Sequence, residues 1–196
     1  IIMEKKIKLA QTVILVDAAY LNFMLVNLKG FLEQQVKRDL PLVSMADLLT
    51  YIALDAQVQE GGKPVQVILI SDESTLKLEH AEPSDLKSEL DGVAFKSTIG
   101  EFLFSSAFTE GLVSREELFL DILEISLDSE DVKKLIILSF DDEYGSAVLD
   151  KINKEDLKKE IIQFRMREPG QKVFFKSENL VFPMMKAFGI SADEIK

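Results

Sequence analysis

Runs of apolar residues alternate along the chain with longer segments in which apolar residues recur every three or four positions. The runs at 12–17, 65–71 and 135–139 are nearly uninterrupted and rich in β-branched residues, which is typical of strands buried on both faces. Residues 18–36, 44–57 and 115–127 show the helical spacing. The alternation predicts an α/β fold, with a mainly parallel sheet between two helical layers, in a single domain over residues 1–196.

Shorter patterns predict the remaining elements. We expect strands at 93–97, 161–166 and 172–177, and helices at 144–152, 155–159 and 183–188. Thr98 and Glu101 have the spacing of a capping box, which predicts a helix over 99–111; Ser114 and Glu117 have the same spacing. Pro83 and Gly92 are placed to begin and end one further short helix.

The charge is strongly acidic overall but unevenly distributed. The formal net charge is −11, yet residues 133–176 carry 10 Lys or Arg against 8 Asp or Glu, and the rest carries 13 against 26. A global negative field repels nucleic acid, whereas a locally basic segment can contact phosphates. That segment includes Lys151 and Arg165. Its basic residues have two interpretations: solvated surface positions, or a landing site for phosphate groups.

Several classes of site are excluded by composition. The chain has no cysteine, so it has no disulfide or thiolate metal site, and a reducing, cytoplasmic location is expected. Its one histidine, His80, lies in a charged loop and does not suit a hydrolytic triad. No stretch has the length and apolarity of a membrane span, so no membrane partner is expected. No glycine-rich phosphate or dinucleotide loop follows the first strand, and a phosphotransferase with Asp17 as nucleophile lacks a second aspartate at position 19.

Carboxylates follow three of the predicted strands. Asp17 ends the first, Asp72 and Glu73 follow the second, and residues 141–143 (Asp-Asp-Glu) follow the strand that ends with Ser139. Parallel strands end at the same edge of a sheet, where ligands of open α/β folds bind. Clustered like charges need a compensating cation or proton, and oxygen ligands suit Mg²⁺ or Mn²⁺. The alternative is local: acidic residues at strand-to-helix junctions cap helices and complement the helix dipole.

The segments "VILVDAAYLNFML" and "LIILSFDDEYGSAVLDKI" resemble the NYN domains of the PIN-like nuclease superfamily. Those domains open with a strand that ends in Asp and is followed by Asn, and carry a later strand that ends in Ser-Gly-Asp-x-Asp-Phe. Asp17 and Asn22 correspond to the first pair. The later motif corresponds to residues 139–144 (SFDDEY), in which Phe140 replaces the glycine and Glu143 the second aspartate. The resemblance implies a PIN-like fold.

The resemblance also implies a metal-dependent nuclease, usually acting on RNA. The family carries a further acid on a helix before the later strand; Glu117 or Asp121 corresponds to it, and Asp121 is favoured because Glu117 belongs to a capping box. The implied catalytic and metal-binding residues are Asp17, Asp121, Asp141 and Glu143. Substrate would be contacted by Asn22, Ser139, Lys151 and Arg165. Mg²⁺ or Mn²⁺ would activate water and stabilise charge on the phosphate.

The sequence also allows a second class of function, as the alternative to the nuclease. The side chain of Phe140 fills space that a glycine leaves free, Glu143 is longer than aspartate, and the surface is acidic. A PIN-like domain that has lost its catalytic activity and serves as a protein-interaction or scaffold module fits these departures. The aromatic segments, such as "EFLFSSAF" and "KVFFKSENLVF", would then supply either core or contact surface.

Overall fold

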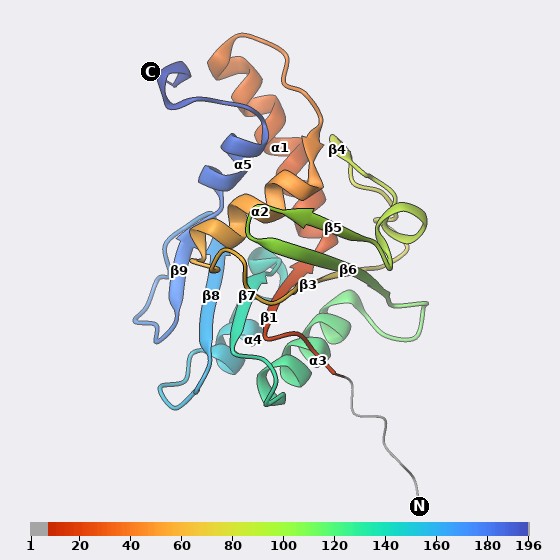
Figure 1. Cartoon of the computed structure of the whole chain (residues 1–196), viewed down its shortest axis with the longest axis vertical. Coiled ribbons are helices and arrows are strands. Elements are labelled where there is room, and N and C mark those ends of the chain that lie inside the picture. The colour runs from red at the N-terminus through yellow and green to blue at the C-terminus, as the bar shows by residue number, and fades with distance from the viewer. Residues whose placement is uncertain (1–7, 196) are drawn as a thin grey trace, which may run out of the picture.

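The computed structural model, which describes residues 8–195, has a central seven-stranded sheet (Figure 1). The strand order across the sheet is β5-β6-β3-β1-β7-β8-β9. All neighbours are parallel except β5, which pairs antiparallel to β6 at one edge. The bounds of these strands are β1 Thr12–Asp17, β3 Val65–Ser71, β5 Ala94–Ser97, β6 Gly100–Phe108, β7 Lys134–Leu138, β8 Glu160–Arg165 and β9 Lys176–Asn179.

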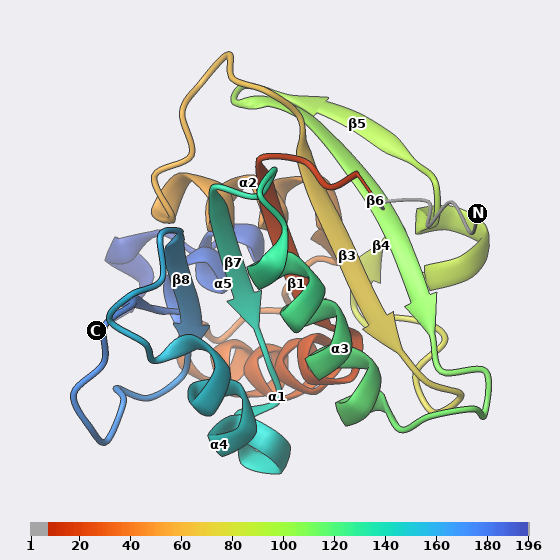
Figure 2. The same cartoon turned by 90° about the horizontal axis from the view of Figure 1, so that it is seen from below.

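Helices cover both faces of this sheet, so the predicted three-layer α/β/α arrangement is confirmed. One face carries α1, α2 and α5, and the other carries α3 and α4, as the view from below shows (Figure 2). The helices span α1 Ala18–Val36, α2 Met45–Asp55, α3 Arg115–Asp128, α4 Asp141–Ile152 and α5 Val181–Ala187. Short elements complete the fold: the π-helix η1 (Leu86–Leu90), the 3₁₀ helix η2 (Ala192–Glu194), and β2 (Val43–Ser44) paired with β4 (Ala81–Glu82).

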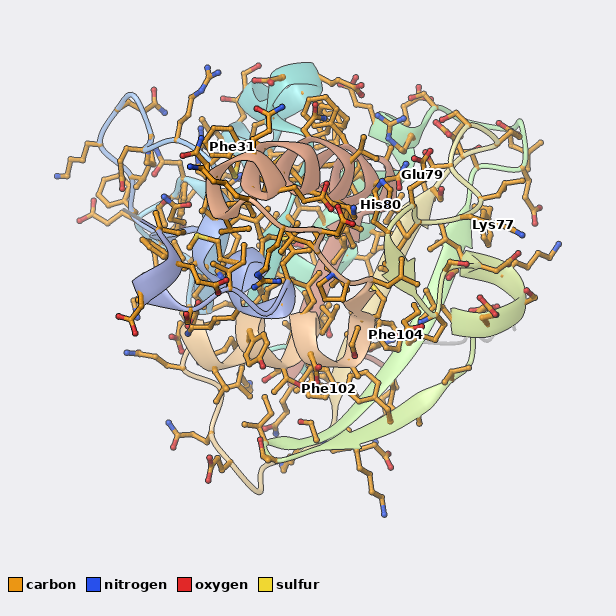
Figure 3. All side chains as sticks on the ribbon, turned by 90° about the horizontal axis from the view of Figure 1, so that it is seen from above. Phe31, Lys77, Glu79, His80, Phe102 and Phe104 are labelled. Carbon is orange, nitrogen blue, oxygen red and sulfur yellow. The ribbon has the colours of Figure 1, made fainter. Side chains whose placement is uncertain are left out.

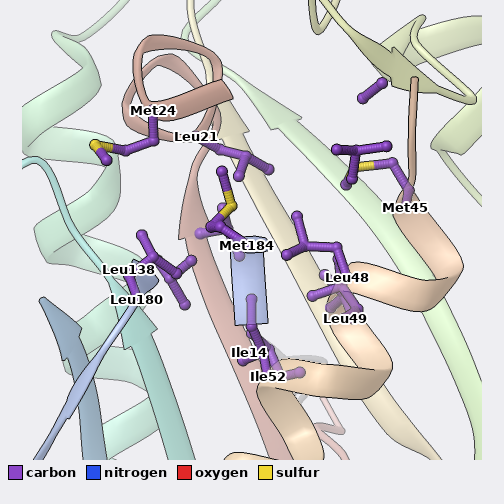
Figure 4. Close-up of a cluster of buried hydrophobic side chains, with 14 of the residues drawn as sticks. Ile14, Leu21, Met24, Met45, Leu48, Leu49, Ile52, Leu138, Leu180 and Met184 are labelled. Carbon is purple, nitrogen blue, oxygen red and sulfur yellow. The ribbon is translucent and has the colours of Figure 1, made fainter. Parts of the chain in front are cut away.

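The larger core lies between the sheet and the α1, α2 and α5 layer. Figure 4 shows Ile14 of β1 among side chains from α1, α2 and α5. Successive residues of β1 face opposite helical layers. Ile14 and Val16 face this core, and Leu15 faces α3 and α4. Because helices cover both faces of the sheet, β1 and β7 consist almost entirely of apolar residues. This is why the sequence predicted these two strands well.

Three predicted elements are corrected by the structure. Residues 100–108 form β6 instead of a helix: Phe102 and Phe104 are buried, pointing toward the α1, α2 and α5 layer, while Leu103 between them is 38% exposed, which is the period of a strand (Figure 3). Residues 155–159 form a turn, since few of them are apolar enough to bury. The last strand is Lys176–Asn179 instead of 172–177, and its register against β8 pairs Phe164 with Glu178.

Several predicted helix starts are confirmed and three are shifted: α4 begins at Asp141 instead of 144, α5 at Val181 instead of 183, and η1 after the expected position. The Ser114 hydroxyl accepts the Glu117 N–H, and the Glu117 carboxylate accepts the Ser114 N–H, which completes the capping box of α3. The short helix expected after Pro83 starts later, at Leu86. Its cap is the carboxylate of Asp85, which accepts N–H groups from the first turn.

Candidate functional site

The carboxyl edge of the sheet is where the candidate residues meet. The parallel strands, numbered in chain order, run 3-2-1-4-5-6 across the sheet, so the direction of winding reverses between β1 and β7. Ligands of open α/β sheets bind outside the strand ends at such a reversal. Asp17 ends β1, and Ser139 and Phe140 connect β7 to α4, so these residues border the reversal point.

A single arginine gathers three of the strand-end carboxylates. The Nε of Arg115, the first residue of α3, lies 2.9 Å from Oδ2 of Asp17, and its Nη1 lies 2.9 Å from Oδ2 of Asp72. Its Nη2 donates to Oε2 of Glu143. The three acids come from the ends of β1 and β3 and from the first turn of α4. We call these four residues, together with Tyr144, the Arg115 cluster.

Asp17 is the most deeply placed member of this cluster, with no exposed surface. Its Oδ1 accepts the N–H of Tyr20 at 3.0 Å and caps α1. Its Oδ2 accepts both from Arg115 and from the hydroxyl of Tyr144. Two hydrogen bonds and an ion pair compensate for the burial of this charge, which would otherwise be strongly unfavourable.

The electrostatics of the Arg115 cluster hold the arginine in its charged form. Burial lowers the pKa of Arg115, but the opposing effect of Asp17 and of the other acids outweighs it and the pKa is raised. Burial, and then the negative charge of Asp17, raise the pKa of the Tyr144 hydroxyl. The pKa of Asp72 is lowered: burial acts to raise it, but hydrogen bonds from Ser74 and Arg115 prevail. Tyr144 therefore stays a neutral donor beside an ionised arginine.

Asp141 belongs to a second, separate cluster at the ends of β7 and β8. Its Oδ1 accepts from the hydroxyl of Ser139 at 2.7 Å and from Nε2 of Gln163 at 3.2 Å. Its Oδ2 lies 3.5 Å from Nη1 of Arg165, which also donates to Oε1 of Gln163. Burial raises the pKa of Asp141 in spite of these partners. We call Ser139, Asp141, Gln163 and Arg165 the Asp141 cluster.

Phe140 contacts groups beside both clusters. Its ring centroid lies 5.3 Å from that of Tyr20 and 5.6 Å from that of Phe23, both on α1. The guanidinium carbon of Arg115 lies 5.7 Å from the same centroid, within the range of a cation–π contact. The bulky side chain at this position is therefore part of the packing at the reversal point.

A cavity of about 470 Å³ opens beside the Asp141 cluster. One wall is a face of α1 with both buried and exposed residues: Tyr20, Phe23, Met24, Asn27, Leu28 and Phe31. The opposite wall is the start of α4 and the end of β8, with Asp141, Asp142, Arg165, Met166 and Arg167. We call this cavity the α1 pocket. Its volume lies within the range of ligand sites in proteins.

The other predicted site residues lie apart from both clusters. Asp121 is exposed on α3, and Lys151 on α4 pairs with Glu124 at 3.1 Å. Asn22 accepts the N–H of Glu79 through Oδ1 at 2.6 Å and so fastens the loop that precedes β4; Figure 3 shows Glu79 and His80 beside α1. Glu117 caps its own helix. Of the eight residues predicted for the site, Asp17 and Glu143 meet in one cluster, and Ser139, Asp141 and Arg165 in the other.

The fit of a divalent cation can be judged from the same contacts. Within residues 8–195, no group of three or more His, Asp or Glu side chains is arranged to hold a metal ion. Both oxygens of Asp17 already accept hydrogen bonds, and the guanidinium of Arg115 supplies the positive charge at the point where the acids converge. Asp141 lies in the other cluster. As arranged, these residues suit a guanidinium and do not fit Mg²⁺ or Mn²⁺.

Arg115, Asp72 and Gln163 were not among the predicted site residues. Arg115 carried a usable signal: a cation in the first turn of a helix opposes the helix dipole and calls for an anionic partner. Asp72 follows a strand, but a carboxylate at this position is also explained by a local turn. In the structure it accepts hydrogen bonds from the N–H and the hydroxyl of Ser74. Gln163 lies within an apolar strand as a fully buried polar residue, which indicates an internal hydrogen-bond partner.

Comparison with known proteins places the chain in a family. A family model described as "Family of unknown function (DUF6621)" matches residues 6–195. The chain belongs to DUF6621. Searches of curated proteins and of solved structures found no match to it. Between residues 8 and 195, none of its helices combines the length and apolarity required to cross a membrane.

Proposed function

We propose that this DUF6621 chain is a catalytically inactive domain of PIN-like type that acts as a protein-interaction or scaffold module. The observation that carries the proposal is the position of Arg115, whose three nitrogens each bind a different carboxylate. A permanent internal cation takes the electrostatic place that a metal ion would have in a nuclease. It stabilises the edge of the sheet and leaves no reactive centre there.

Two further features support an inactive domain. Phe140 packs against α1 and the guanidinium at the point where the resemblance to NYN domains implies a glycine. Asp141, the acid that corresponds to a metal ligand in those domains, is committed to Ser139, Gln163 and Arg165. Exposed apolar side chains on α1, with Phe23 46% and Phe31 57% exposed, supply a surface suited to a partner protein.

A metal-dependent ribonuclease is the second candidate, favoured by one observation. Acids from β1, β3 and α4 converge on a single point, and a movement of Arg115 out of this point would leave three carboxylates close together. Asp17 and Glu143 would then be ligands of Mg²⁺ or Mn²⁺, and RNA would be the substrate.

Calorimetric titration with Mn²⁺ separates the two functions. The wild-type chain and the Asp17→Asn and Arg115→Met variants are compared, with circular dichroism to verify folding. The inactive domain is expected to show no Mn²⁺ binding in the wild type and no cleavage of single-stranded RNA in Mn²⁺. Wild-type binding and cleavage that both disappear in Asp17→Asn would overturn the proposal in favour of the nuclease. Asp39→Asn is the control, because this residue is exposed and lies outside both clusters.

A further inference from the structure

The α1 pocket is lined by a tyrosine whose hydroxyl has no hydrogen-bond partner among residues 8–195. Tyr20 lines the pocket and is only 8% exposed. Its backbone N–H binds Asp17, but among residues 8–195 its hydroxyl has no hydrogen-bond partner. No buried side-chain nitrogen or oxygen in residues 8–195 lacks a hydrogen-bond partner, so the Tyr20 hydroxyl is accessible from the open cavity. It can therefore bind a group that enters the cavity.

The pocket is also continuous with an exposed apolar surface. Phe23, Asn27 and Phe31 follow one another at four-residue intervals along α1, and Val26 lies beside them with 38% of its surface exposed. Figure 3 shows Phe31 at the outer side of this helix. A small ligand would occupy the cavity alone, whereas a chain of residues would also cover the exposed phenylalanines. The surface therefore favours a peptide segment over a small molecule.

The charges on the pocket wall are complementary to a segment with both polar and acidic groups. Asp141 and Arg165 are paired with each other at 3.5 Å. In the described part of the chain, neither Asp142 nor Arg167 has an ion-pair partner, although both line the pocket. Asp142 lies in the first turn of α4, where the helix dipole stabilises it, whereas Arg167 has no such local role. Arg167 is thus available for a carboxylate.

The region around the Tyr20 hydroxyl is negative, in contrast to the positive charge of Arg167. Burial, and then the negative charges of Asp141 and Asp142, raise the pKa of this hydroxyl, and Arg165 opposes them to a smaller extent. A group that donates a hydrogen bond is favoured there. A peptide backbone offers such an N–H beside an apolar side chain, and an acidic neighbour can reach Arg167.

From these contacts we propose that the α1 pocket is a peptide-binding site of the chain. It takes a partner segment with one bulky apolar side chain next to an acidic residue. The apolar side chain fills the cavity against Met24 and Phe31, the Tyr20 hydroxyl accepts a backbone N–H, and Arg167 binds the acidic side chain. This inference rests on the proposed interaction function and specifies its site.

The test exploits the absence of tryptophan from the chain, so that the fluorescence of a bound peptide has no tryptophan background. The probe is a library of blocked hexapeptides with a central tryptophan and random neighbours. Members with an adjacent aspartate or glutamate are expected to bind best. Phe31→Ser and Arg167→Glu should each weaken the best binder about tenfold, as for a central interface residue. Tyr20→Phe should weaken it with no loss of stability, since the hydroxyl has no partner in the described protein.

Leu112→Ser is the matched control, because Leu112 is 82% exposed and does not line the pocket. The proposed site would be refuted if no member of the library binds, or if Phe31→Ser and Arg167→Glu leave the affinity unchanged. Equal affinity for N-acetyl-tryptophan amide would also overturn it, in favour of a small-molecule pocket. The Mn²⁺ titration reports on the Arg115 cluster alone. A failed peptide test with no Mn²⁺ binding would therefore refute the site and leave the inactive domain standing.

Discussion

The Nε of Arg115 lies 2.9 Å from Oδ2 of Asp17, and this pair joins the first turn of α3 to the end of β1. The arginine side chain is 12% exposed and the aspartate is fully buried. The residues are 98 positions apart in the chain, so the pair exists only once the sheet has formed.

Replacement of Arg115 by methionine should destabilise the fold strongly. It keeps most of the side-chain volume but leaves the buried Asp17 without its ion-pair partner, and breaking a buried pair costs about 3 to 5 kcal/mol. Urea unfolding measures the change. The control is Arg38→Met, which breaks an exposed pair with Glu194 and should cost less than about 1 kcal/mol. Equal losses for the two variants would contradict the structural role of Arg115.

The hydroxyl of Tyr144 should contribute measurably to stability through Asp17. Tyr144→Phe removes one of the donors to a buried carboxylate, which costs about 1 to 3 kcal/mol. Tyr20→Phe removes a hydroxyl with no partner in the described structure and should change the free energy of unfolding by less than about 0.5 kcal/mol. Thermal unfolding of both variants tests this contrast, and a reversed order would be inconsistent with the Arg115 cluster.

The 3₁₀ helix η2 should remain attached to the segment that follows α1 in moderately acidic solution. A hydrogen bond from Arg38 is the main cause that lowers the pKa of Glu194 from 4.5 to about 2. For an acid with a lowered pKa, the stabilising contribution is present above 4.5 and is lost as the pH falls through about 2. An NMR titration of the Glu194 carboxyl carbon measures this window directly. A midpoint near 4.5, or one that Arg38→Met does not raise, would show that the pair does not form in solution.

Asp121, predicted as a catalytic acid, should be dispensable for stability. It is exposed on α3, so Asp121→Asn should change the free energy of unfolding by less than about 0.5 kcal/mol. Asp17→Asn leaves Arg115 beside a neutral group and should cost several times as much. Chemical denaturation of the two variants gives the comparison, and a large loss in Asp121→Asn would require a role for this residue that its exposed position does not explain.

The sequence predicted the sheet and most helices, because burial leaves a strong periodic signature in β1, β3 and β7. It failed at β6, where Thr98 and Glu101 imitated a capping box while the alternation of Phe102, Leu103 and Phe104 indicated a strand. The strand-end acids were correctly expected to gather at one edge. Their division into two clusters depends on Arg115, from a distant helix, and on Gln163 and Arg165 of β8. Neither fact is encoded locally.

Asp17 also has a consequence for how the domain opens. One of its oxygens binds α1 on one face of the sheet, and the other binds α3 and α4 on the opposite face. A fluctuation that detaches either helical layer must therefore break a bond to the same carboxylate. We expect amide hydrogen exchange in the first turns of α1 and α4 to be slow and to proceed through a shared opening event. A change that weakens one contact of Asp17 should therefore accelerate exchange on both sides of the sheet.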